Sequence, residues 1–197
     1  MIDKAKMYYD PNVVRYAVYR YETFWLPFLL SKGISNADTS VLDLEFAPPI
    51  DVHWVWHVHM LCPTAYAMDC SRICDRSIGH RLRSAEEEDT LRNVTRQAWV
   101  EHFGSDVPFD VDPQEVLEKS TVPPDDFAAN SKFSYDIVEA VERQKMFYYQ
   151  VSLPHYKNQE FLAEALVRYK KFLALKVSKP ESFIVPTYDI DIMWHTH

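Results

Sequence analysis

The sequence has little glycine and little cysteine, with three residues of each in 197. It therefore lacks a glycine-rich phosphate-binding loop, and it contains no Gly-x-Ser-x-Gly or His-Glu-x-x-His motif that would indicate a catalytic class. The cysteines fall between positions 62 and 74, and their odd number excludes a framework of paired disulfides. Unpaired thiols are typical of a reducing compartment, so we predict a soluble, cytoplasmic protein.

Long apolar runs and an excess of positive charge are also missing. No run approaches the ~20 residues needed to cross a bilayer, and the N-terminal residues lack the apolar segment of a signal peptide. The 21 Lys and Arg residues are outnumbered by 29 Asp and Glu residues, which gives a formal net charge of -8. Such a chain repels nucleic-acid phosphates. We expect no nucleic acid and no membrane as partner, and the sequence does not identify a protein partner.

What the sequence does contain is a twelve-residue motif that occurs twice. Pro48 to His59 reads PPIDVHWVWHVH, and Pro186 to His197 reads PTYDIDIMWHTH. The two copies hold three of the five Trp and five of the eight His. An Arg-Tyr-x-x-Phe sequence precedes each copy, at Arg20 and at Arg168. This shared register indicates an internal duplication whose unit is a helix, a connector and a Trp-His-x-His element.

Helix signals occur along most of the chain. Capping residues and prolines predict helices over about 11–26, 51–61, 63–74, 84–104 and 135–151, a short helix after 112, a long helix after 158 and a last element from 189. Pro27 marks a kink or the end of the first helix, and Asp51 is the predicted cap of the second. Ser84 and Glu87 form a predicted capping box for the helix over 84–104, whose apolar face is predicted to consist of Leu91, Val94, Ala98 and Phe103. Two segments, 41–46 and 183–185, are predicted to be extended, and their equivalent repeat positions allow them to pair. We therefore predict a mainly α protein with at most a few short extended segments.

The duplication also predicts how the chain is organised. We expect a single domain over 1–197, made of two related halves at about 11–74 and 158–197 that a helical middle segment, 84–151, joins. Each half leaves one apolar face uncovered, so the halves are predicted to pack on each other about a pseudo-two-fold axis. In that arrangement Trp56 and Trp194 occupy equivalent buried positions.

The repeated motif supplies candidate metal ligands, which are His53, His57, His59, Asp191, His195 and His197. In a helix, residues four apart share a face, so His53 lies over His57. Asp191 then lies over His195 in the second copy. In an extended segment, residues two apart share a face, which selects His57 with His59 and His195 with His197. Either set suits zinc or iron, and a site shared by both copies would place His57 within a few ångströms of His195.

Each of these residues also has an ordinary structural interpretation. A His beside a buried Trp is more often a packed, hydrogen-bonded core residue, and an Asp at the start of a helix is more often a cap. Cys70 and Cys74 are four apart on a predicted helix and could join His59 at a zinc ion, but buried free thiols are more common. The sequence leaves the metal-binding and the structural interpretations open.

The motif and its surroundings resemble a known family. Pro63, Tyr66, Asp69 and Cys70 follow the first copy, and a Phe-Tyr-Tyr-Gln-Val-Ser run starts at Phe147. From about residue 20 onward, these features make the chain similar to the glycine-rich domain-containing protein family of plants, fungi and some animals. The resemblance implies a module of unknown biochemical activity, whose plant members are implicated in development and stress responses.

Members of that family continue beyond the second Trp-His-x-His, so the resemblance implies that the second half is truncated at His197 and is less stable than in a longer chain. Two hypotheses about function result. The first is an intracellular regulatory or protein-interaction module, which the aromatic-rich repeat and the missing catalytic motifs support. The second is a metal-binding protein or metal-dependent enzyme that uses the His clusters of the two copies.

Overall fold

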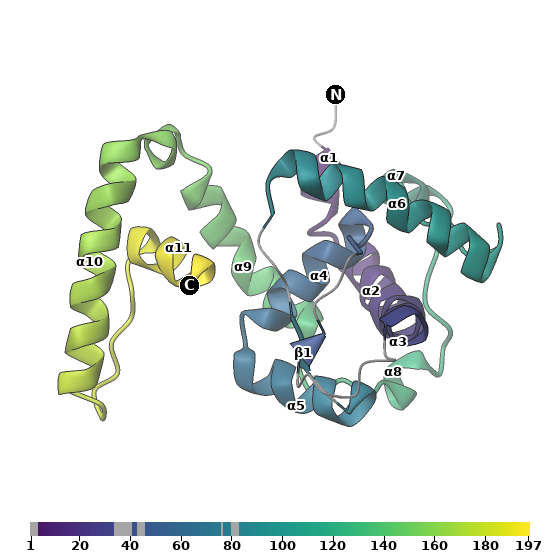
Figure 1. Ribbon diagram of the computed structural model, residues 1–197, viewed down its shortest axis with the longest axis horizontal. Coiled ribbons are helices and arrows are strands. Elements are labelled where there is room, and N and C mark those ends of the chain that lie inside the picture. Colours follow the sequence, from purple (N-terminus) through teal and green to yellow (C-terminus); the bar gives the residue numbers. More distant parts are fainter. Residues whose placement is uncertain (1–3, 34–40, 43–45, 76, 80–82) are drawn as a thin grey trace. The chain divides into compact units, whose positions relative to one another are not determined.

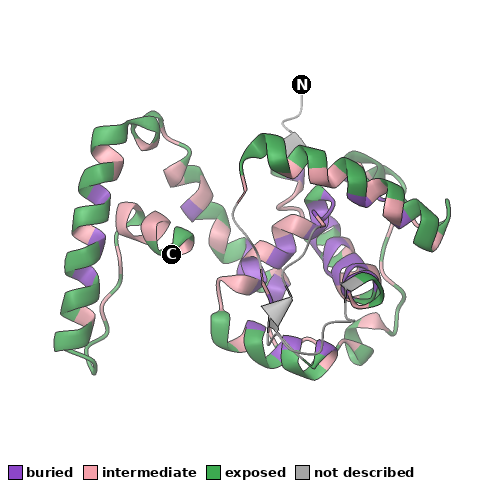
Figure 2. Ribbon diagram, viewed as in Figure 1, coloured by how far each residue is buried: buried purple, intermediate pink, exposed green. Residues whose placement is uncertain are grey.

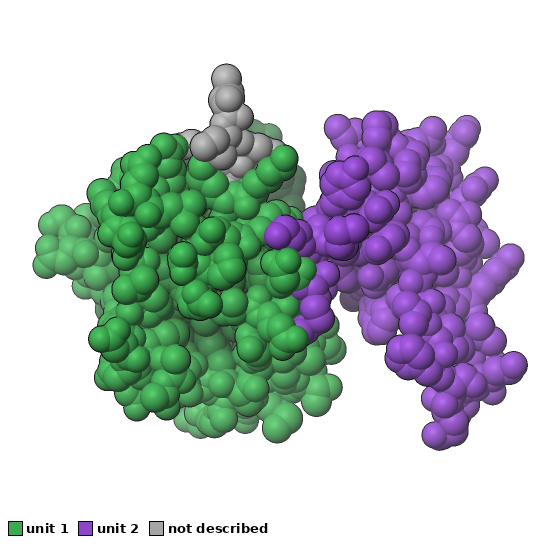
Figure 3. Space-filling model, turned by 180° about the vertical axis from the view of Figure 1, so that it is seen from behind, with its two compact units in different colours: residues 1–142 green, residues 143–197 purple. Residues whose placement is uncertain are grey.

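The computed structural model describes residues 4–33, 41–42, 46–75, 77–79 and 83–197, and the chain divides into two compact units. The first unit covers residues 1–142 and the second covers residues 143–197 (Figure 3). Helices make up most of the described chain (Figure 1), which confirms the mainly α prediction. None of the helices in the described ranges is long and apolar enough to cross a membrane.

The helices of the first unit are α1 (Lys4–Met7), α2 (Pro11–Arg20), the π-helical turn η1 (Tyr21–Trp25), α3 (Leu26–Gly33), α4 (Ile50–Met60), α5 (Pro63–Cys74), α6 (Ala85–Phe103), α7 (Pro113–Glu118) and α8 (Phe127–Asn130). The helix α9 (Ile137–Val151) runs from the first unit into the second. The second unit also contains the 3-10 turn η2 (Pro154–Lys157), α10 (Gln159–Ser178) and α11 (Tyr188–Thr196).

Two short strands, β1 (Val41–Leu42) and β2 (Ser77–Ile78), pair in parallel within the first unit. The predicted pairing of 42–46 with 183–185 is therefore wrong, because Leu42 pairs with Ile78 and residues 183–185 form no strand. Residues 43–45 lie outside the described part of the chain. A partner just after α5 closes a much shorter loop than a partner near the end of the chain, so it costs less conformational entropy.

The first long helical segment continues further than the sequence predicts. Asp10 starts α2 as expected, since its side chain accepts a hydrogen bond from the Asn12 N–H at 2.8 Å. The predicted end near Leu26 is wrong, because the chain passes through Pro27 into α3. The turn before Pro27 is π-helical, and the Leu26 N–H donates to the Tyr21 carbonyl. This i to i−5 spacing tolerates a proline, which has no N–H to donate.

The first copy of the repeated motif forms α4, which lies inside the first unit. Ile50 is the one residue of α4 whose side chain is exposed, and the other ten are buried or half-buried. In Figure 2, this helix is accordingly drawn mostly in purple and pink. The predicted cap of this helix is wrong: Pro49 occupies the N-cap position, and Asp51 lies within the first turn. The following helix, α5, has the predicted bounds of 63–74. A helix covered on nearly all sides is a core helix.

Aromatic rings from α3, α4, η1 and α6 fill the core of the first unit. The Trp25 ring centroid lies 6.0 Å from that of Trp56 and 6.3 Å from that of Trp99, and Phe28 lies 5.3 Å from Trp99. The predicted capping box at the start of α6 is confirmed. The predicted apolar face of α6 is partly wrong, because Val94 is 50% exposed whereas Trp99 is fully buried.

The second unit has a smaller core, formed where α10 packs on α11. Its buried side chains include Tyr169 and Phe172 of α10. Trp194 contacts Phe172, with ring centroids 6.3 Å apart, yet 52% of its surface is exposed. The prediction that Trp194 is buried like Trp56 is therefore wrong. Phe172 is the aromatic neighbour of Trp194 among the described residues, whereas Trp56 packs against both Tyr21 and Trp25. The single domain and the pseudo-two-fold packing of the two halves stay predictions.

Candidate functional site

The first candidate site begins with a buried pair of opposite charges. Arg20 ends α2 and Asp51 lies in the first turn of α4, with Arg20 Nε 2.7 Å from Asp51 Oδ2 and both side chains at most 5% exposed. The two remaining guanidinium nitrogens donate to the carbonyls of Pro108 and Phe109 at 2.8 and 2.7 Å. Burial raises the pKa of Asp51, and the adjacent Arg20 charge opposes this rise. The pair fixes α2 against α4.

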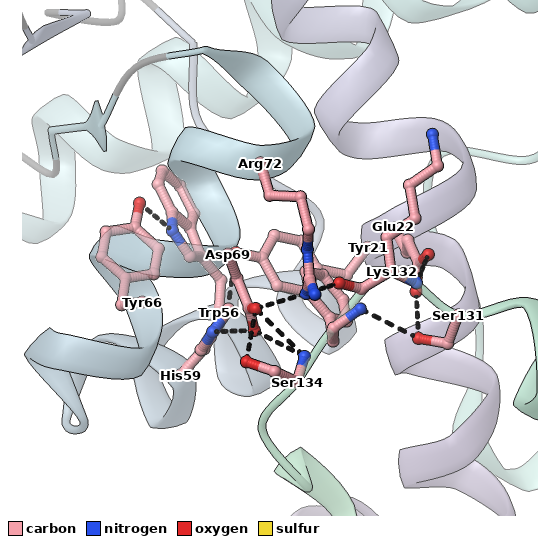
Figure 4. A network of polar contacts seen from close by, with 11 residues as sticks. Tyr21, Glu22, Trp56, His59, Tyr66, Asp69, Arg72, Ser131, Lys132 and Ser134 are labelled. Carbon is pink, nitrogen blue, oxygen red and sulfur yellow. Dashed lines mark hydrogen bonds and ion pairs between the residues drawn. The ribbon is translucent and has the colours of Figure 1, made fainter.

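His59, near the other end of α4, is completely buried between two polar partners. Its Nδ1 lies 3.3 Å from the Tyr21 hydroxyl and its Nε2 lies 3.3 Å from Asp69 Oδ2 (Figure 4). A carboxylate only accepts, so Nε2 carries the hydrogen and Nδ1 accepts from Tyr21. Burial lowers the pKa of His59 to about 4, against the opposing effect of Asp69. His59 is therefore neutral at neutral pH.

Asp69, on α5, accepts hydrogen bonds from two directions. The Ser134 N–H and hydroxyl donate to it at 3.0 and 2.6 Å, and Arg72 donates at 2.6 Å. Burial alone would raise the pKa of Asp69, but the hydrogen bonds from Ser134 and Arg72 outweigh it and hold that pKa below its ordinary value. Arg72 also donates to the Lys132 carbonyl. Asp69 thus joins α5 to the segment that precedes α9.

Trp56 completes this network beside His59. Its Nε1–H donates to the Tyr66 hydroxyl at 2.9 Å, and Tyr66 donates in turn to the Ile78 carbonyl at 2.6 Å. Trp56, His59 and Asp69 are each 1% exposed or less. A network whose central side chains are so completely buried holds α4, α5 and β2 together.

The second copy of the motif makes two of the same contacts in the second unit. Arg168 Nε lies 2.5 Å from Asp189 Oδ2, and the Tyr169 hydroxyl lies 2.7 Å from His197 Nδ1. These are the atoms that make the contacts Arg20 to Asp51 and Tyr21 to His59 in the first copy. Burial would raise the pKa of Asp189, but hydrogen bonds from Thr187 and Arg168 lower it below the ordinary value. The two copies therefore share a polar arrangement as well as a sequence pattern.

The side chains of the predicted metal ligands contact carboxylates and aromatic rings. His53 Nδ1 lies 3.6 Å from Glu88, and His57 stacks on Trp54 with ring centroids 6.3 Å apart. His195 Nε2 lies 3.7 Å from Asp191 Oδ1, as helical spacing predicts. Burial lowers the pKa of His195 and raises that of Asp191. Among the described residues, no three His, Cys, Asp or Glu side chains are grouped so that they could hold a metal ion.

Several parts of the metal prediction concern contacts between the two copies, which lie in separate units. The closeness of His57 to His195 stays a prediction, as does metal binding by the six candidate residues. The cysteines are free thiols, and Cys70 and Cys74 are buried. Burial raises the pKa of Cys70, which keeps its thiol protonated and poorly suited to bind zinc.

A groove on the first unit is the second candidate site. It has a volume of about 860 Å³ and lies between α2 and the segment 123–142. Its apolar lining includes Val14, Val18, Phe127, Phe133, Ile137, Val138 and Val141. Its charged lining consists of Arg15, Asp125, Asp136, Glu139 and Glu142.

Sequence reasoning missed several residues of these sites. It noticed that an Arg-Tyr pair precedes each motif, but it assigned no role to Arg20, Tyr21 or their counterparts. It interpreted Asp51 as a cap, although the same Asp recurs in the second copy. An arginine and an aspartate recur together in both copies, and this recurrence was the signal for an ion pair. The partners of Asp69 and the lining of the groove come from segments far apart in sequence, and no local pattern announced them.

Comparison with known proteins provides a family assignment. Residues 65–197 match the family described as "Glycine-rich domain-containing protein-like". The whole chain is 36% identical to the glycine-rich domain-containing proteins 1 and 2 of Arabidopsis thaliana, and it covers 24% of each of them. The chain thus spans about a quarter, 24%, of the length of these curated relatives. No solved structure matches it.

Proposed function

We propose that this chain, which belongs to the glycine-rich domain-containing protein-like family, is an intracellular protein-interaction module whose groove beside α2 binds an apolar and basic peptide segment. Two properties of the groove support this function, its apolar floor and its acidic rim. The free and buried thiols of Cys70 and Cys74 support an intracellular location, since unpaired cysteines are typical of reducing compartments.

The floor of the groove supports binding of apolar side chains. Val14, Val18, Ile137 and Val141 are buried at its base, and Phe127 is half-buried in its wall. A volume of about 860 Å³ is large enough for several side chains of a bound peptide. An amphipathic helix commonly binds in such a groove by placing its apolar face on the floor.

The charges around the groove support a basic partner. Four carboxylates, those of Asp125, Asp136, Glu139 and Glu142, line it together with a single cation, Arg15. All five residues are exposed, so their charges act through solvent at the rim. Opposite charge on a peptide would speed its encounter with the groove and fix its orientation.

The test uses the full chain and a fluorescent amphipathic peptide of about 15 residues made of Leu and Lys. We expect the peptide to bind, and we expect chemical-shift changes in the protein's NMR spectrum at α2 and residues 123–142. A matched peptide with Glu in place of Lys should bind at least about tenfold more weakly. Raising the salt concentration should weaken the first peptide's binding.

Variants of the protein then locate the interaction. The double substitution Glu139→Lys and Glu142→Lys should weaken binding of the Lys peptide and strengthen binding of the Glu peptide. The control reverses two exposed charges elsewhere, with Glu101→Lys and Glu181→Lys, and should change neither affinity. Equal binding of both peptides, or shift changes outside the groove, would contradict the proposed function.

A further inference from the structure

The groove beside α2 adjoins a smaller hollow on the same unit, which we call the side hollow. It has a volume of about 420 Å³, and its apolar lining includes Tyr19, Pro27, Leu30 and Ile73. Pro124 and Phe127 line the groove as well as the side hollow, and no other residue of the described chain lines both. The Phe127 side chain therefore lies between two apolar spaces that both border α2.

The short helix that carries Phe127 is weakly attached to the rest of the unit. None of the four residues of α8, all of which the structure describes, is buried. The carboxylate of Asp126, at the N-cap position, accepts from Asn130 Nδ2 at 3.2 Å instead of capping the first turn. The Phe127 ring lies edge-on against the Tyr19 ring, with centroids 5.2 Å apart. A helix of one turn has little stability of its own, so α8 depends on this ring contact to stay in place.

The chain on either side of α8 is held by hydrogen bonds. The Thr121 N–H donates to a carbonyl of α7 at 2.9 Å. The Glu22 carboxylate accepts from the Ser131 hydroxyl and from the Lys132 N–H, each at 2.6 Å. Between these points, seven of the nine residues 122–130 are exposed. A segment with so few buried contacts opens locally at a low free-energy cost, so α8 can leave the surface while both ends stay attached.

We propose that the groove and the side hollow together bind a basic, apolar peptide with one aromatic residue, and that this residue displaces Phe127 and releases α8. The inference rests on the proposed function, since it concerns the same groove and the same class of peptide. The Phe127 ring shows which side chain fits between the two apolar spaces. Edge-on aromatic pairs are worth more than their buried area alone, so Tyr19 favours a Phe over a Leu there.

The sign of one substitution separates a displaceable Phe127 from a fixed one. Phe127→Ala in the full chain is titrated with the fluorescent Lys peptide. Removing an internal competitor raises the fraction of the protein that can bind, so we expect the peptide to bind about tenfold more tightly. A fixed Phe127 would instead contribute contacts to the bound peptide, and its removal would weaken binding. Weaker or unchanged binding to the variant overturns the proposal.

Two further variants of the same segment serve as a control and as a second test. Val122 is 62% exposed and lies outside the described lining of both spaces, so Val122→Ala should leave the affinity unchanged. Ala129→Gly weakens α8 without altering the Phe127 ring, because glycine is a poor helix former. It should tighten peptide binding by about threefold, and it tests the proposal even if Phe127→Ala fails to fold. An Ala129→Gly variant that binds no more tightly than the parent chain contradicts the release of α8.

The preference for an aromatic residue is tested with a set of Lys peptides in which one Leu at a time is replaced by Phe. At one position, Phe should increase the affinity for the parent chain by about fivefold. Tyr19→Leu removes the ring partner and should abolish this gain, while the affinity of the Leu form changes less. If the gain is the same with and without Tyr19, the peptide ring does not take the place of Phe127.

The nuclear Overhauser effect between the rings of Phe127 and Tyr19 reports the displacement directly. We expect it in the free parent chain, and we expect it to disappear when the chain is saturated with the best Phe-containing peptide. An effect between the peptide ring and Tyr19 should replace it. Persistence of the Phe127 effect at saturation overturns the displacement but leaves the proposed function intact. If the Lys peptide binds neither the parent chain nor Phe127→Ala, the proposed function itself is wrong.

Discussion

Removing the Asp51 carboxylate should destabilise the first unit far more than removing its counterpart, Asp189, destabilises the second. Asp51→Asn keeps the size of the side chain but leaves Arg20 charged, 1% exposed and held only by two backbone carbonyls. Breaking a buried ion pair in this way typically costs about 3 to 5 kcal/mol. Arg168 remains in contact with solvent, since its side chain is 39% exposed, so loss of Asp189 leaves no buried charge.

The assay is urea unfolding followed by tryptophan fluorescence at pH 8. Trp194 is the one tryptophan of the second unit, so a Trp194→Phe background makes fluorescence report on the first unit. We expect Asp51→Asn to lower the free energy of unfolding in this background by about 3 to 5 kcal/mol. The control, Asp189→Asn, should leave the same transition unchanged. A loss below about 1 kcal/mol for Asp51→Asn would refute the reasoning, because exposed ion pairs contribute that much.

Two further predictions concern His59 and the two equivalent tryptophans. Burial lowers the pKa of His59 from 6.5 to about 4, so the unfolded chain takes up this proton first as pH falls. The free energy of unfolding should therefore decrease between pH 6.5 and about 4, by up to about 3 kcal/mol. His59→Gln should abolish this part of the pH dependence of stability. If the urea midpoint of the variant depends on pH as that of the parent chain does, the prediction is wrong. Trp56→Ala should cost about 3 to 5 kcal/mol, because Trp56 is a core residue. Trp194→Ala should cost much less, and calorimetric melting curves of both variants test this contrast.

The sequence predicted the bounds of a helix well where the capping residues and prolines that set them lie within or next to that helix. The bounds of α5 and the capping box at Ser84 and Glu87 depend only on residues a few positions apart, and both are confirmed. The helix end near Pro27 was predicted wrongly because a single π-helical turn precedes this proline. In that turn the backbone N–H groups donate to carbonyls five residues earlier, as Leu26 does to Tyr21, instead of four. The burial of Trp99 in place of Val94 depends on which side of α6 faces the core, and tertiary packing decides that.

The candidate sites were less predictable than the helices because their contacts connect distant segments. Ser134 donates to Asp69 from 65 residues away, and the carbonyl partners of Arg20 lie 88 and 89 residues away. Helical spacing did predict the approach of Asp191 to His195, which are four residues apart. It could not predict that His59 would face Asp69, because that contact depends on the turn between α4 and α5.

The two repeated contacts are placed so that they fix one helix against another without needing burial. In each copy, the Arg and the Tyr are adjacent in one helical segment, which passes from α2 into η1 in the first copy and is α10 in the second. The Asp and the His are eight residues apart along the second segment, which is α4 in the first copy and α11 with its C-cap His197 in the second. Eight residues of α-helix span about 12 Å, so the contacts hold the second helix at two distant points. Two such points restrict both sliding and rotation, whereas either contact alone would leave one of these movements open. The arrangement therefore persists in the second unit although Trp194 is half-exposed.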